Sequence, residues 1–201
     1  MGNQVKQTVC AEMSIHPWVE SNAMRELRSY DRNWAAVYQV LRGYIERNVR
    51  DVSVEHIGST AVPELKSKSM VDMLVITQRQ DLQEVKRALV ALGFHERDVW
   101  VDTEDKPYVC GSVVHAGTTY DVNVHVCRLD SATHVNSLRF RDALRREANL
   151  RREYEAIKMK AIREVGNNPE EYNKFKSRFI QRVIEAESAH VGDATGLPAD
   201  G

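Results

Sequence analysis

Residues 55–77 read EHIGSTAVPELKSKSMVDMLVIT, and the rest of the chain is best understood from this stretch. The β-branched, alternating run that ends at Ile57 predicts a strand, and the small residues of Gly58-Ser59-Thr60 predict the turn that ends it. Residues 70–77 are almost continuously apolar, which is typical of a central strand buried on both faces. Asp72 places a carboxylate inside that strand. A turn that can hold phosphate, next to a strand that carries a carboxylate, suits metal-assisted nucleotide chemistry.

The composition is that of an ordinary globular chain. Of its 201 residues, 42% are hydrophobic and 28% are charged, and the net charge is −1. This near-neutral charge argues against a dedicated nucleic-acid binder, and no apolar run approaches the ~18 residues of a membrane span. The three cysteines form no CxxC pair, which suits a reducing compartment. We therefore expect a cytoplasmic protein without a membrane segment or a nucleic-acid partner, and the oligomeric state is left open.

The two ends of the chain lack the periodicity of its middle. We expect residues 1–24 to be a poorly ordered arm, with residues 25–188 as one domain and 189–201 as a loose tail. Ser21-Asn22-Ala23-Met24 also resembles the remnant of an expression vector, which would make Met24 the natural start.

The hydrophobic periodicity predicts an α+β domain with a mixed sheet and a helical part from about residue 135. Asp31 is a good N-cap for a first helix, and Asp81 for a second helix that runs to Leu92. Strands are expected at residues 52–57, 70–77, 99–102, 108–115 and 119–126. Three further helices are expected at residues 138–147, at 149–165 and from Asn168 onward.

The last predicted strand has one apolar and one polar face. Because side chains alternate along a strand, Asp121, Asn123 and His125 point to the side opposite the valines between them. Such a polar row is either solvated or lines a site. If this strand neighbours Asp72, His125 could ligate a metal or act as an acid or base, and Asp121 could be a further carboxylate.

Several separated blocks resemble one known family, the GrpB-like family of the nucleotidyltransferase superfamily. The blocks are HIGSTAVP at 56–63, Lys68 with VDMLV at 71–75, NVHV at 123–126, FRDALR at 140–145 and YEAIK at 154–158, after an entry segment YDRNW at 30–34. They occur in the family's order and extend over roughly residues 25–188, so the resemblance is far more specific than a lone Gly-Ser turn.

The resemblance implies a mixed sheet flanked by helices, a phosphate-binding turn and a magnesium-binding strand. On this basis the catalytic candidates are Asp72, His125 and Lys68. The candidates for nucleotide and phosphate binding are Gly58, Ser59, Thr60, Lys158, Arg141 and Arg145. The metal candidates are Asp72 and Asp121, and the supporting residues are His56 and Asn123.

Two positions depart from the family pattern. Many superfamily members carry two acids at positions i and i+2 of the metal strand, whereas this chain has Asp72 and Leu74. Two metal ions need several carboxylates to offset their charge, so Leu74 weakens the expectation of a two-metal site. The family's Pro-Gly-Leu is here Pro63-Glu64-Leu65.

Structural explanations stand beside these assignments. The Gly58-Ser59 turn could be an ordinary turn, and Asp72 could be hydrogen-bonded or paired with Lys68. Lysine and arginine outnumber acids by 13 to 7 over residues 139–182. A few of these cations, with Lys176 among the candidates, could close over a triphosphate, whereas most could lie on solvated helix faces.

The sequence favours an Mg²⁺-dependent nucleotidyltransferase-like enzyme that binds a nucleoside triphosphate, most simply ATP. The acceptor would be an unidentified small molecule or protein. Two alternatives stay open. The chain could be a degenerate nucleotide-binding or interaction module without turnover, or it could use ATP to activate a carboxylate for amide formation.

Overall fold

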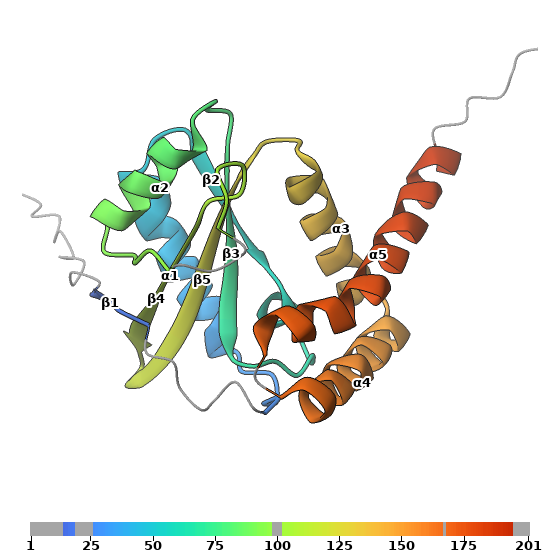
Figure 1. Cartoon of the computed structure of the whole chain (residues 1–201). Helices are drawn as coiled ribbons and strands as arrows, with labels where there is room; N and C mark the ends of the chain where they lie inside the picture. The colour runs from blue at the N-terminus through green and yellow to red at the C-terminus, as the bar shows by residue number, and fades with distance from the viewer. Residues whose placement is uncertain (1–13, 19–25, 98–101, 167, 195–201) are drawn as a thin grey trace, which may run out of the picture.

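A computed structural model describes residues 14–18, 26–97, 102–166 and 168–194. Its centre is a five-stranded mixed sheet in the order β1-β4-β5-β3-β2, which confirms the α+β class (Figure 1). The strands are β1 (Ile15–His16), β2 (Val52–Ile57), β3 (Met70–Thr77), β4 (Tyr108–His115) and β5 (Thr118–Arg128). The helices are α1 (Asn33–Asn48), α2 (Leu82–Ala91), α3 (Ala132–Arg146), α4 (Ala148–Val165) and α5 (Pro169–Ala194), with a short 3-10 turn, η2, at Ser59–Ala61.

Strand β3 organises the sheet because it pairs on both sides. It runs antiparallel to β2 and parallel to β5, and the register with β5 sets Asp72 opposite Asn123. Val71, Met73 and Val75 point to one face, where they form the main core with α1 and α2. Asp72 therefore points to the other face, since side chains alternate along a strand.

The C-terminal helices form a second core against the turn that follows β2. Phe140 of α3, Tyr154 of α4 and Phe179 of α5 make ring contacts with one another. They bury Val62 and Leu65, which follow η2. Figure 1 shows α1 and α2 on one side of the sheet and α3, α4 and α5 on the other. The turn thus lies where the two layers of helices meet the sheet.

Most element positions agree with the sequence-based predictions. The predicted bounds of β2, β3 and β4 match the structure. The side chain of Asp81 caps α2 by accepting from the backbone N–H groups of Gln83 and Glu84. Asp31 accepts a hydrogen bond from the backbone N–H of Asn33 at 2.8 Å. Helix α1 begins at Asn33, one residue later than an N-cap at Asp31 would place it.

The differences lie near the ends. Ile15–His16 pairs with β4 as β1, inside the segment expected to be an arm. A two-residue strand has too short a pattern to be predicted, and it fits because Gly111 of β4 has no Cβ, which would lie 2.6 Å from Ile15 Cγ2. Helix α5 continues to Ala194, past the predicted boundary near Ser188. The predicted strand at 99–102 and the segment 21–24 fall largely outside the described residues.

Glu64 is held in a backbone conformation that favours glycine. Its φ is +67°, at the position where the family pattern has Gly. We expect Glu64→Gly to raise the free energy of unfolding by about 0.5–1 kcal/mol, because relief of left-handed strain of about 1–2 kcal/mol exceeds the entropic cost of glycine. Thermal unfolding should shift upward by roughly 2 °C. An unchanged or lower midpoint would show that the exposed Glu64–Arg151 pair, at 3.2 Å, outweighs the strain.

Candidate functional site

A buried lysine contacts the turn after β2. Lys158 of α4 is 1% exposed, and its Nζ donates to Ser59 Oγ at 3.1 Å. The same ammonium also donates to the backbone oxygen of Lys66. A lysine is rarely buried without a partner carboxylate, and the described residues give its Nζ only neutral oxygen acceptors. The structure thus brings two of the predicted phosphate-binding residues, Ser59 and Lys158, into contact.

Two more lysines gather beside this pair around one aromatic ring. Lys68 Nζ lies 3.4 Å from the centroid of the Tyr172 ring, and Lys176 Nζ lies 4.2 Å from the same centroid. Lys68 comes from the loop before β3, whereas Tyr172 and Lys176 come from α5. We call Lys68, Lys158 and Lys176 the lysine cluster.

Crowding and burial destabilise the charged forms of these lysines. Burial, with repulsion from Lys176 and Lys68, lowers the pKa of Lys158 to about 7. Burial lowers the pKa of Lys68 to about 8, and burial with repulsion from Lys68 lowers the pKa of Lys176 to about 8. A polyanion in this place would remove the repulsion and favour all three ammonium forms. The cluster therefore has the electrostatics that would favour an anion.

Asp72 lies on the sheet beside the cluster and is tied into a polar chain. Asn123 Nδ2 donates to Asp72 Oδ1 at 2.8 Å, and Tyr108 Oη donates to Asn123 Oδ1 at 2.5 Å. Burial raises the pKa of Asp72, while His125, the hydrogen bond from Asn123 and Lys176 act in the opposite direction. Burial lowers the pKa of His125, and Asp72 opposes this. The predicted grouping of Asp72, Asn123 and His125 on one face is thus present.

Gly58 allows the turn to lie directly against Asp72. Its φ of +69° and ψ of −168° belong to a region that is essentially restricted to glycine. A Cβ on this residue would lie 2.4 Å from Asp72 Oδ2 and 3.0 Å from Asp72 Cβ. Only glycine fits at position 58, and its lack of a side chain lets the turn lie against the Asp72 carboxylate.

We expect Gly58→Ala to lower the free energy of unfolding by roughly 2–4 kcal/mol, as backbone strain and forced repacking act together. Chemical denaturation measures this loss. Gly117→Ala is the matched control, since Gly117 also has a positive φ, +76°, but nothing lies within 4 Å of the added Cβ. Gly117→Ala should lower the free energy of unfolding only by the cost of the left-handed backbone conformation, without a steric contribution. Equal losses in both variants would mean that the contact with Asp72 has no steric consequence.

The donor set around Asp72 fits one magnesium ion. Mg²⁺ in nucleotide sites is commonly held by one or two carboxylates, with phosphate oxygens and waters completing the octahedron. No group of three His, Cys, Asp or Glu side chains that could hold a metal occurs among the described residues. Asp121 accepts from Ser112 Oγ at 2.7 Å and lies opposite Met70, two register pairs before Asp72. The arrangement suits a single ion at Asp72, whose coordination shell would be completed by substrate oxygens and waters.

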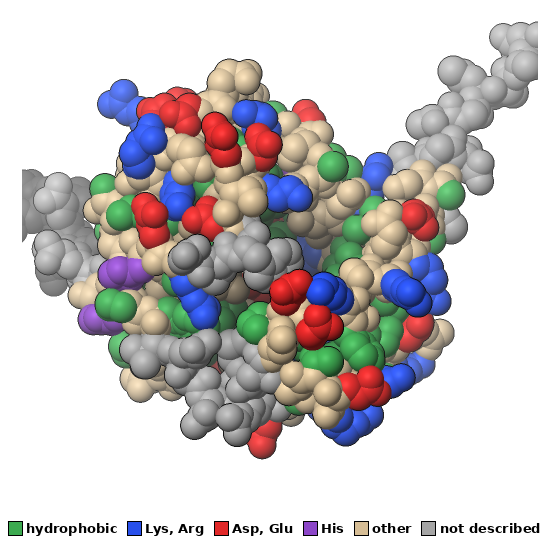
Figure 2. Space-filling model, in the orientation of Figure 1, with side chains coloured by type: hydrophobic (Ala, Val, Ile, Leu, Met, Phe, Trp, Pro, Cys, Tyr) green, Lys and Arg blue, Asp and Glu red, His purple; other side chains and the backbone are tan. Residues whose placement is uncertain are grey.

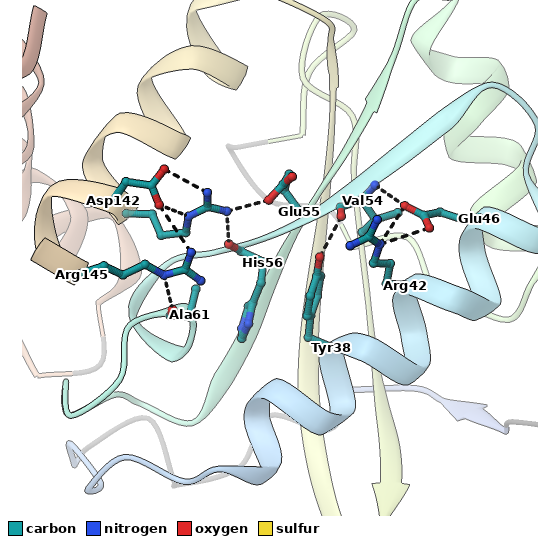
Figure 3. A network of polar contacts seen from close by, with 10 residues as sticks. Tyr38, Arg42, Glu46, Val54, Glu55, His56, Ala61, Asp142 and Arg145 are labelled. Carbon is teal, nitrogen blue, oxygen red and sulfur yellow. Dashed lines mark hydrogen bonds and ion pairs between the residues drawn. The ribbon is translucent and has the colours of Figure 1, made fainter.

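Four of the predicted site residues make their contacts away from the lysine cluster and Asp72. The Thr60 hydroxyl is 3.0 Å from His56 Nε2, and His56 stands on the face of β2 turned toward α1. Arg141 pairs with Glu55 at 2.7 Å and with Asp142 at 2.8 Å, and it donates to the His56 backbone oxygen. Arg145 Nε donates to the Ala61 backbone oxygen at 3.0 Å. Figure 3 shows Glu55 and His56 pointing to opposite sides of the strand.

The sequence indicated Lys176 only as one of several basic residues that could bind a triphosphate, and it placed Tyr172 on the inner stripe of its helix. Both sit on α5, where Tyr172 fits the buried stripe and Lys176 is one of many basic residues. The available signal was their spacing, since residues four apart share a helix face. It could not show which part of the sheet that face meets.

The comparisons with known proteins agree with the fold and with the blocks around the site. Residues 25–186 match the family described as GrpB protein. The chain belongs to the GrpB family. It is 35% identical over 162 residues to UPF0157 protein SCO7215 of Streptomyces coelicolor, covering 78% of this chain and 81% of that one. It is 26% identical over 193 residues to UPF0157 protein BH1888 of Halalkalibacterium halodurans, covering 92% and 91%.

Two solved structures share the fold. GrpB from Enterococcus faecalis matches with a TM-score of 0.65 and 21% identity over 81% of this chain and 96% of that chain. Cid1 poly(U) polymerase in a form with Mg 3′-dATP bound matches with a TM-score of 0.50 and 16% identity, covering 76% of this chain and 50% of that one. This GrpB-family chain therefore has a nucleotidyltransferase-like fold.

Two further observations concern the surface. No helix in the described part of the chain is long and apolar enough to cross a bilayer. Figure 2 shows acidic and basic side chains interspersed over the visible face, without a broad single-sign area.

Proposed function

We propose that this protein binds a nucleoside triphosphate, most simply ATP, and transfers its nucleotidyl group to an acceptor. The observation that carries the proposal is the convergence of three lysines and Ser59 next to Asp72. The nucleotidyltransferase-like fold supports the same reading. A triphosphate carries about four negative charges, and three ammonium groups with one divalent ion held by the Asp72 carboxylate would balance them.

The chain's own groups would hold the polyphosphate in place. The Ser59 hydroxyl and the Lys158 ammonium, already 3.1 Å apart, would both donate to phosphate oxygens. Lys68 and Lys176 would stabilise the charge that develops on the leaving pyrophosphate. Because these groups are fixed before the substrate arrives, little reorganisation is needed during transfer.

Asp72 would hold a single Mg²⁺, and Asn123 would keep the carboxylate oriented through its 2.8 Å hydrogen bond. When bound, that ion supplies Lewis-acid polarisation of the α-phosphate. Leu74 supplies no second carboxylate, so the lysine cluster takes over part of the charge compensation that a second ion would give.

His125 is placed to receive the acceptor's proton. Burial keeps the imidazole neutral by lowering its pKa, and it shares the sheet face with Asp72. A neutral imidazole can take a proton from an attacking hydroxyl or amine as the α-phosphate is attacked and pyrophosphate leaves. Asp72 then stabilises the imidazolium. A carboxylate acceptor would need no base, and its acyl nucleotide could go on to an amide.

The experiment combines ATP binding with pyrophosphate release. In the wild type, Mg-ATP should raise the unfolding midpoint, and Ser59→Ala and Asp72→Asn should each remove most of that shift. Pyrophosphate release is then measured across hydroxyl, amine and carboxylate acceptors. An unchanged midpoint shift in both variants would overturn the site assignment.

A second candidate, a nucleotide-binding module without turnover, is favoured because β3 carries the single carboxylate Asp72 and has Leu74 two residues later. It would show the same ATP-dependent stabilisation without pyrophosphate release from any acceptor. The two proposals are therefore separated by the second measurement and share the first.

A further inference from the structure

A groove lies behind the phosphate turn, on the other face of the sheet from the lysine cluster. Its volume is about 510 Å³, and its lining includes Tyr30, Tyr38, Gln39, His56, Thr60 and Arg145. This volume is in the range of about 300–1,000 Å³ typical of small-molecule sites. His56 pairs with Met73 in the β2–β3 register, and Met73 belongs to the core under α1 and α2. Asp72 and the groove are thus on opposite sides of the sheet.

The floor of the groove is polar and uncharged. His56 is 4% exposed, stacks on Tyr38 with the ring centroids 4.7 Å apart, and lies 3.0 Å from the Thr60 hydroxyl. Burial, with repulsion from Arg145 and Arg141, lowers the pKa of His56 to about 3. The imidazole is therefore neutral at physiological pH. Figure 3 shows the two rings side by side between α1 and β2.

One wall of the groove carries a positive charge that is only partly offset. Arg145 donates from Nε to the Ala61 backbone oxygen, and its contact with Asp142 is 3.5 Å long. That carboxylate is held more closely by Arg141, at 2.8 Å and 3.1 Å. Burial lowers the pKa of Arg145 and the field of Arg141 adds to this, while Asp142 and Glu55 oppose it. The lining holds two arginines, Arg145 and Arg151, and one carboxylate, Glu64, which pairs with Arg151 at 3.2 Å.

We propose that this groove is a second binding site, which takes a small molecule with a planar apolar body and one anionic head group. The head group, a carboxylate or a phosphate, would pair with the exposed guanidinium of Arg145. The body would lie against Tyr38 and Tyr30. The proposal is independent of the nucleotide site, since it uses none of the lysines.

The groove shares its turn with the nucleotide site. Ser59 faces Lys158, whereas the next residue, Thr60, faces His56. Arg145 is bonded to Ala61, the last residue of that turn. A ligand that orders Arg145 therefore acts, through Ala61, on the turn that positions Ser59.

The test uses the full chain and two probes, benzoate and phenyl phosphate, with benzamide as the neutral comparison. Amide chemical shifts in a heteronuclear NMR titration give the dissociation constant. At least one anion should perturb α1 and the Ser59–Ala61 turn, while benzamide should bind at least about tenfold more weakly. Benzoate alone would identify the head group as a carboxylate, and phenyl phosphate alone as a phosphate.

Three variants locate the binding. Arg145→Gln keeps a donor for Ala61 but removes the charge, and it should weaken binding about tenfold or more. Gln39 is an exposed residue on the rim, so its replacement leaves the fold intact. Gln39→Glu should weaken binding roughly threefold and Gln39→Lys should strengthen it by a similar factor, as expected for exposed charges.

Lys158→Met should leave binding of the anion unchanged. Loss of binding in Lys158→Met would place the anion in the lysine cluster and overturn the proposal. The same conclusion follows if neither anion perturbs the groove at millimolar concentration, or if Arg145→Gln and the two Gln39 variants bind as the wild type does.

Discussion

Lys158→Met should abolish most of the affinity for Mg-ATP while leaving the folded protein as stable as the wild type. Lys158 is 1% exposed and contacts Ser59 Oγ at 3.1 Å. Truncating one partner of a buried charge-assisted contact costs about 2–4 kcal/mol of binding, which is roughly 30- to 700-fold in the dissociation constant. Calorimetric titration of Mg-ATP measures the change.

Stability should behave differently from affinity in this variant. Methionine fills similar volume and removes an ammonium group that is costly to bury, so the free energy of unfolding should stay equal or rise. Lys160→Met is the matched control, because Lys160 lies two residues away on α4 with a side chain 58% exposed. It should bind Mg-ATP like the wild type. Equal affinity losses in both variants would mean that the general charge of α4, not the buried lysine, attracts the nucleotide.

A rise in pH from 7 to 8 should weaken ATP binding and stabilise the ligand-free protein at the same time. The pKa of Lys158 is about 7 and those of Lys68 and Lys176 are about 8, well below the usual 10.5. Phosphate prefers the ammonium forms, so binding takes up protons. The affinity should therefore fall by up to about tenfold per pH unit for each proton taken up.

The free energy of unfolding of the ligand-free protein should rise with pH, whereas the affinity for ATP falls. Between pH 7 and pH 8 the unfolded chain keeps all three lysines protonated, whereas the folded chain has begun to release these protons. The unfolded state binds more protons, and the free energy of unfolding rises with pH. Urea denaturation of the ligand-free protein at both pH values measures this slope, and Lys158→Met should reduce it. A flat or falling slope in the wild type would contradict the electrostatic description of the cluster.

The sequence-based predictions succeeded where the physical signal is local. Alternation and β-branching located β2, β3 and β4, and the polar face of β5 was correctly predicted from the two-residue period. Gly58 and Asp72 were predicted as neighbours, and the structure explains the glycine by the 2.4 Å approach of Asp72 to an added Cβ.

The sequence could not single out Lys176 from the other basic residues and gave Tyr172 no role in the site, because both depend on tertiary contacts. Lys176 and Tyr172 lie about a hundred residues from Asp72 along the chain, so only the packing of α5 against the sheet brings them together. Thr60 and Ser59 are adjacent in sequence but face different sites, because the turn after Gly58 directs one toward His56 and the other toward Lys158. Adjacent small polar residues give no sequence signal for such a division.

The central claim is that the lysine cluster and Ser59 bind the phosphates of a nucleotide. Calorimetric titration of ATP into the wild-type protein at pH 7 with Mg²⁺, repeated in the presence of pyrophosphate, tests it most directly. We expect about one ATP to bind per chain and pyrophosphate to displace it competitively. The absence of any ATP binding, or binding that pyrophosphate does not displace, would contradict it.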